Sequence, residues 1–173
     1  MAKTLIAYFS RADENYFGGS MRYVEVGNTE IAVGKIRELI DADVFKIEMV
    51  NPYSKGYKAC IDEARADLRS KARPELLSMP ESIDAYDTVI LAYPNYWGTM
   101  PMAVFTFLEH FDFTGKVILP LCTNEGSGMG ASVRDIRSVC RGVKVQDGLP
   151  LRGSAVEDSK PQIEQWLRSN GLI

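Results

Sequence analysis

Short apolar runs alternate with segments of helical periodicity along the chain. Residues 3–9 and 87–93 are almost continuously apolar, which is typical of strands buried on both faces. Residues 28–40 instead carry apolar side chains at helical spacing. In chain order the pattern predicts strands at 3–9, 43–49, 87–93, 116–121 and 143–151, and helices at about 28–40, 54–72, 101–109, 131–140 and from 160 onward.

This alternation of strands and helices predicts an α/β fold. A strand that returns parallel to its predecessor needs a crossover, and helical crossovers cover both faces of the sheet. No linker or low-complexity tract interrupts the pattern, so residues 1–173 are expected to form a single domain. In such sheets, ligands bind beyond the carboxyl ends of the strands.

The first predicted strand leads into a polar segment whose residues could bind an anion. Ser10 and Arg11 follow this strand, and Asn28 and Thr29 precede the first helix, with either of the latter as its N-cap. Helix amides and these side chains could together hold a phosphate. An ordinary capped helix without a ligand is the alternative.

Two further loops follow the strands at 87–93 and 116–121. The loop 94–98 carries the aromatic pair Tyr96 and Trp97, and the loop 123–128 is rich in glycine. Because parallel strands end at the same edge, these loops should meet the first one around one crevice. One loop suits a phosphate, one a flat ring, and one offers backbone hydrogen-bonding groups.

These three loops resemble those of the flavodoxin family. Ser10 and Arg11, joined by Gly27, Asn28 and Thr29, resemble a phosphate loop whose compact form is Ser-x-Thr-Gly-Asn-Thr, here split by an insertion at about 12–26. The other two loops resemble the family's two flavin-contacting loops. The resemblance implies a flavodoxin-like three-layer α/β/α sandwich with a five-stranded parallel sheet in the order 2-1-3-4-5, and FMN as the cofactor.

The resemblance also implies which residues contact FMN. The phosphate would be held by Ser10, Asn28 and Thr29, with Arg11 nearby. The isoalloxazine would be bordered by Pro94, Asn95, Tyr96, Trp97 and Gly98, with Trp97 or Tyr96 against its face. The other side would be closed by Thr123, Asn124, Glu125, Gly126, Ser127 and Gly128. This last loop lacks the tyrosine that commonly covers the outer ring face in flavodoxins, so that face is expected to be open to a substrate. No catalytic or metal-binding residue is predicted.

The insertion at 12–26 contains several aromatic residues, among them Tyr16, Phe17 and Tyr23. The favoured interpretation is a surface loop packed by its own aromatic side chains. The alternative is functional: a flap over the phosphate or a docking surface for a partner.

Charge and cysteine usage narrow the function classes. The net charge of −3 does not favour nucleic acid as a partner. No apolar run is long enough for a membrane span and no signal-peptide pattern is present, so a cytoplasmic protein without a membrane partner is expected. Cys60, Cys122 and Cys140 form no Cys-x-x-Cys motif and are predicted to be buried or semi-buried thiols, not nucleophiles.

The function implied by the resemblance is electron transfer by an FMN-binding flavodoxin, with a redox partner protein or a small-molecule electron acceptor. The alternative is an NAD(P)H-dependent quinone or flavin reductase on the same fold. The mild charge and the open ring face favour the reductase, whereas the absence of an evident nicotinamide motif disfavours it. A third interpretation is a domain that binds a phosphorylated ligand without redox chemistry, which would not need Tyr96 and Trp97.

Overall fold

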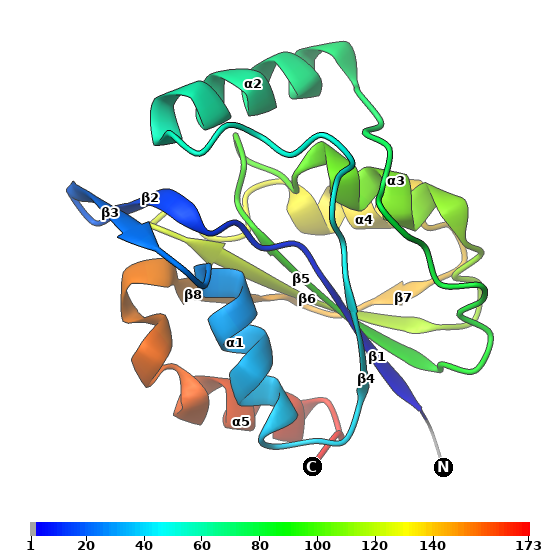
Figure 1. The fold of residues 1–173 in the computed structure, drawn as a ribbon. Coiled ribbons are helices and arrows are strands. Elements are labelled where there is room, and N and C mark those ends of the chain that lie inside the picture. Colours follow the sequence, from blue (N-terminus) through cyan, green and yellow to red (C-terminus); the bar gives the residue numbers. More distant parts are fainter. Residues whose placement is uncertain (1–2) are drawn as a thin grey trace.

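A computed structural model describes residues 3–173; the predicted domain also includes residues 1 and 2, which lie outside the described part. The central sheet runs in the order β4-β1-β5-β6-β7, with β8 also paired to β6, and all of these pairings are parallel (Figure 1). Its strands are β1 (Thr4–Tyr8), β4 (Asp43–Lys46), β5 (Thr88–Pro94), β6 (Val117–Asn124), β7 (Lys144–Val145) and β8 (Leu149–Arg152).

Helices cover both faces of this sheet, which confirms the predicted three-layer α/β/α fold (Figure 1). On one face, α1 (Asn28–Arg37) and α5 (Lys160–Ser169) pack on Ile6, Ile90 and Leu121. On the other, α3 (Met102–His110) and α4 (Ser132–Val139) pack on a cluster that includes Leu91. The helix α2 (Tyr57–Ser70) lies on this second side, where Leu68 contacts the same cluster.

The far edge of the sheet corrects the predicted five-stranded order. The strand expected at 143–151 is two short strands, β7 and β8, which pair with separate parts of β6. The strand β6, predicted at 116–121 with an interruption at Pro120, runs without a break from Val117 to Asn124. Proline lacks the N–H that a ladder needs, and the gap between β7 and β8 lies opposite Leu119 and Pro120. The break in the edge strand therefore lies opposite the part of β6 that lacks a backbone hydrogen-bond donor.

The insertion, for which we expected a surface loop packed by its own aromatic side chains, forms a β-hairpin. Its strands β2 (Asp13–Phe17) and β3 (Ser20–Val24) pair antiparallel. The two-residue turn between them is Gly18-Gly19, both with positive φ, as a type I′ hairpin turn requires. The hairpin projects from the carboxyl end of β1 beside the start of α2 (Figure 1).

Other boundaries differ from the predicted ones by a few residues at either end. The short 3-10 helix η1 (Gly153–Asp158) between β8 and α5 was not predicted. The predicted apolar face of the last helix is confirmed, since Ile163, Trp166 and Leu167 are buried. None of the helices within residues 3–173 is both long and apolar enough to cross a lipid bilayer.

Candidate functional site

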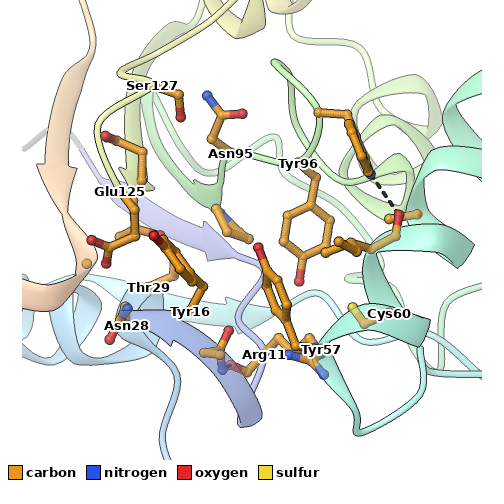
Figure 2. Close-up of a pocket in the computed structure, with 18 of the residues that line it drawn as sticks. Arg11, Tyr16, Asn28, Thr29, Tyr57, Cys60, Asn95, Tyr96, Glu125 and Ser127 are labelled. Atoms are coloured by element: carbon orange, nitrogen blue, oxygen red, sulfur yellow. Dashed lines mark hydrogen bonds between the residues drawn. The ribbon is translucent and has the colours of Figure 1, made fainter. Parts of the chain in front are cut away.

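A cavity of about 370 Å³ lies at the carboxyl ends of β1, β5 and β6 (Figure 2). The loops that follow these three strands line it, together with the hairpin, the start of α2 and the start of η1. All the predicted site residues except Gly126 and Gly128 border this cavity: Ser10, Arg11, Asn28, Thr29, Pro94, Asn95, Tyr96, Trp97, Gly98, Thr123, Asn124, Glu125 and Ser127. Segments distant in sequence are thus brought to one place.

Gly126 and Gly128 shape the third loop instead of lining the cavity. Both have positive φ, which glycine adopts without steric cost. The Gly126 amide donates to Asn124 Oδ1 at 2.9 Å, and the Gly128 carbonyl accepts a 3.0 Å bond from Asn95 Nδ2. The first bond lies within the third loop, and the second joins that loop to the second one.

The two halves of the split phosphate-loop motif meet at the start of α1. The N-cap is Gly27, so the prediction of Asn28 or Thr29 is wrong. Ser10 takes over the usual capping bond, because its Oγ accepts the Glu30 amide at 3.1 Å. A Cβ on Gly27 would overlap Ser10 Oγ and lie 2.5 Å from the Arg11 carbonyl oxygen. Only glycine permits this close contact between the two sides of the insertion.

Asn28 and Thr29 connect this helix start to the other walls of the cavity. The buried hydroxyls of Thr29 and Thr123 share a hydrogen bond of 2.8 Å. The Asn28 side chain lies so close to Gly153 that a Cβ there would overlap its Nδ2. The N–H groups in the first turn of α1 also have no carbonyl partner within the helix. This end of the cavity therefore offers hydrogen-bond donors to an anion.

A carboxylate also lies at this end of the cavity. Glu125 Oε1 would be 3.1 Å from a Cβ on Gly153, next to Asn28. Its two oxygens accept bonds from the Ser154 amide at 2.7 Å and from Ser154 Oγ at 3.0 Å. Glu125 thus ties the third loop to η1 and places a negative charge beside the donors.

Arg11 borders the cavity, but its guanidinium fastens the hairpin to the segment that precedes α2. It donates to the carbonyls of Ser54 at 2.9 Å and Lys55 at 2.6 Å, and also to the carbonyl of Glu14 on β2. Within the described residues, its buried Nε has no partner. The side chain therefore acts first as a clamp between two segments of chain.

The aromatic pair lies in a tight turn at the opposite end. Tyr96 and Thr99 exchange backbone bonds, and Trp97 and Gly98 between them both have positive φ. That conformation is unfavourable for tryptophan, and it is held by two contacts: the indole N–H donates to the Ile61 carbonyl at 2.8 Å, and the Arg65 guanidinium lies 5.0 Å from the ring centroid. Trp97 remains 46% exposed at the cavity mouth.

The Gly98 backbone is held from both sides. Its amide donates to Asn95 Oδ1 at 2.9 Å, and its carbonyl accepts the Ala131 amide at 2.7 Å. A Cβ on Gly130 would overlap that carbonyl oxygen and lie 2.8 Å from the carbonyl carbon. The aromatic turn is therefore seated directly against the segment that begins α4.

The sequence reasoning missed the residues that the hairpin and α2 contribute. These are Asn15, Tyr16, Tyr57, Cys60, Ile61 and Ala64, together with Gly153. A signal for those on α2 exists in the sequence. The residues at 57, 60, 61 and 64 repeat at helical spacing and interrupt an otherwise charged segment, which indicates a face with a partner.

The cysteines are buried, as predicted. Burial raises the pKa of the Cys60 thiol and raises the pKa of Cys122 and Cys140 to about 12. The thiol that borders the cavity is therefore protonated at neutral pH and unsuited to nucleophilic attack. In the part of the chain that the structure describes, no group of histidine, cysteine and acidic side chains could hold a metal ion.

Solved structures share this fold over most of their length. A Bacteroides uniformis protein described provisionally as a flavoprotein is 26% identical, with a TM-score of 0.77 over 96% of this chain and 98% of the other. A Lactobacillus acidophilus flavoprotein in complex with FMN is 19% identical, with a TM-score of 0.68 over 91% and 98%. An apo NADH:FMN oxidoreductase is 15% identical, with a TM-score of 0.52 over 98% and 90%. At these identities the last two show the fold alone.

The family assignment comes from a sequence comparison. No curated protein matches the chain significantly. The family model described as Flavodoxin, however, matches residues 3–170, from the start of β1 to the end of α5. The confirmed fold and the cavity at the carboxyl ends of its strands agree with this match. The chain therefore belongs to the flavodoxin family.

Proposed function

We propose that this protein binds FMN and acts as an electron-transfer protein. The observation that carries the proposal is the convergence of the helix start, the aromatic turn and the third loop on one cavity. Family membership supports it, as does the FMN complex of the Lactobacillus acidophilus protein with the same fold. Bound FMN would supply the redox chemistry, and the residues of this chain would hold and orient it.

The anion end fits the phosphate of FMN. The first amides of α1, the Ser10 hydroxyl and the Asn28 amide group are donors, and donors at a helix start favour negative charge. The close contacts at Gly27 and Gly153 narrow the space around them. A phosphate placed here would be bound without a lysine.

The opposite end fits a planar ring. Tyr96, Trp97, Ile61 and Ala64 give it an aromatic and apolar lining, and Asn95 supplies a polar group at its border. The volume of about 370 Å³ lies near the lower end of the range of about 300–1,000 Å³ for small-molecule sites. This cavity therefore has room for one ligand of this kind.

Titration with FMN tests the proposal. We expect the purified protein to acquire a yellow flavin spectrum and to quench the fluorescence of added FMN, because an aromatic side chain against the ring quenches it. Riboflavin should bind more weakly, since it lacks the phosphate. A preparation whose spectrum and added FMN fluorescence both stay unchanged would contradict FMN binding.

A reductase remains the second candidate, and one observation favours it. Arg65 places a positive charge beside Trp97 at the cavity mouth, where an anionic dinucleotide could approach. Steady consumption of NADH or NADPH by the FMN-loaded protein with a quinone would decide for this activity. Electron exchange with a protein partner, without such turnover, would decide for the carrier.

We expect Glu125→Gln to tighten FMN binding while leaving riboflavin binding unchanged. The glutamine keeps an acceptor for Ser154 but removes a negative charge beside the proposed phosphate position. Repulsion between charges several ångströms apart near a surface costs about 1 kcal/mol, which corresponds to about a 5-fold change in Kd. Parallel titrations with FMN and riboflavin at low salt measure it. Glu25→Gln, which changes the net charge equally but does not line the cavity, is the control; equal effects in both variants would contradict the assignment.

A further inference from the structure

Two tyrosines from outside the predicted loops form a wall of the cavity. Tyr16 comes from β2 of the hairpin and Tyr57 from the first turn of α2, and both side chains border the cavity. Their rings stack with centroids 6.2 Å apart and planes inclined by 27°. In Figure 2 they point into the space that Asn95 and Ser127 border from the other side.

This wall is built from several contacts between the hairpin and α2. The Tyr57 amide donates to Glu14 Oε1 at 2.9 Å, and the Glu14 amide donates to the Lys55 carbonyl at 3.3 Å. Arg11 bonds carbonyls on both segments. The backbone at Tyr57 is thus held by the same contacts that keep the hairpin in place.

This wall supplies aromatic side chains, which the third loop lacks. The segment 123–128 has no aromatic side chain, so that loop cannot cover a planar ring. Tyr57 is partly buried where it borders the cavity, whereas Tyr16 and Trp97, which also border it, are 38% and 46% exposed. Burial raises the pKa of the Tyr57 phenol, so this side chain is uncharged at neutral pH.

We infer that Tyr57, with Tyr16 stacked on it, covers the outer face of the planar ring, and that the inserted hairpin is therefore part of the cofactor site. The inference rests on the proposed FMN binding. A covered face and a cavity with room for one ligand leave no place for a second planar substrate stacked on the ring. The partner class that fits is one that exchanges electrons at an edge of the ring, as a carrier does.

The test measures Kd values for riboflavin and FMN by fluorescence quenching. Tyr57→Ala should weaken both ligands about 10-fold and to the same extent, because only the ring contact is lost. Tyr57→Phe should bind within about 2-fold of the unmodified protein, and Tyr16→Ala should lose about 3-fold. The control is Tyr23→Ala, which removes an exposed aromatic ring from the same hairpin outside the cavity.

Equal Kd values for Tyr57→Ala and Tyr23→Ala would overturn the inference while leaving the proposed function intact. A parent protein that binds neither flavin would instead defeat the proposed function. Thermal unfolding without ligand shows whether each variant is folded. If Tyr57→Ala is unfolded, Tyr57→Leu, which keeps an apolar side chain without an aromatic ring, takes its place under the same criterion.

Discussion

Gly27→Ala should lower FMN affinity about 100-fold. The added Cβ would overlap Ser10 Oγ and lie 2.5 Å from the Arg11 carbonyl oxygen, so the start of α1 must move away from the end of β1. Such a shift would misplace at least two donors to the phosphate, and hydrogen bonds to a charged group contribute about 1.5 kcal/mol or more each. Together they amount to about 3 kcal/mol, which is about 100-fold in Kd. Titration with FMN measures the change.

The matched control for this variant is Gly56→Ala. Gly56 is the N-cap of α2, with φ −68° and ψ 137° against −69° and 159° at Gly27, but a Cβ there meets nothing within 4 Å. The backbone effect of alanine is therefore nearly the same, whereas the overlap is absent. We expect Gly56→Ala to bind FMN like the parent protein. Similar losses of FMN affinity in both variants would show that the close contact at Gly27 does not cause the loss.

Gly130→Ala should reduce the free energy of unfolding by about 2–5 kcal/mol. Gly130 has φ +54°, where a side chain costs about 1–2 kcal/mol. Its Cβ would also overlap the Gly98 carbonyl oxygen, which accepts the Ala131 amide, and relieving a backbone overlap costs about 1–3 kcal/mol more. Denaturant unfolding of the protein without ligand measures the loss. Because Gly98 belongs to the aromatic turn, FMN affinity should fall as well.

Gly128→Ala separates these two costs. Gly128 lies in the same loop with φ +67°, yet a Cβ there meets nothing within 4 Å. It should therefore lose only the conformational part, about 1–2 kcal/mol. If the two alanine variants unfold at the same denaturant concentration, the contact between Gly130 and the aromatic turn contributes nothing to stability.

The sheet and its three loops could be predicted because their signals are local. Continuous apolar runs identify β1 and β5, and the residues that follow a parallel strand must lie at its carboxyl end. Ser10, Tyr96 and Thr123 could therefore be placed together without knowledge of any contact between them. The split of the last strand was missed because it depends on what Pro120 offers a neighbour, which no single segment reveals.

The contributions of the hairpin and α2 could not be predicted because they depend on contacts between segments. Nothing in the sequence around Tyr16 shows that it stacks on Tyr57, since the two meet only through the bonds of Arg11 and Glu14. The N-cap prediction failed for a similar reason, because the side chain that caps α1 is that of Ser10, from the segment after β1. Local capping preferences cannot identify a donor or acceptor supplied from elsewhere.

The contact between Ser10 and Gly27 has a consequence for how this protein can be altered. Ser10 precedes the hairpin and Gly27 follows it, so the two ends of the inserted segment lie close together. A segment with such closely spaced ends can be lengthened at its tip without moving the elements that carry it. Gly19, where a Cβ would meet nothing within 4 Å, is open in this way. The tip is accordingly a natural graft point for a reporter or an added recognition module beside the cavity.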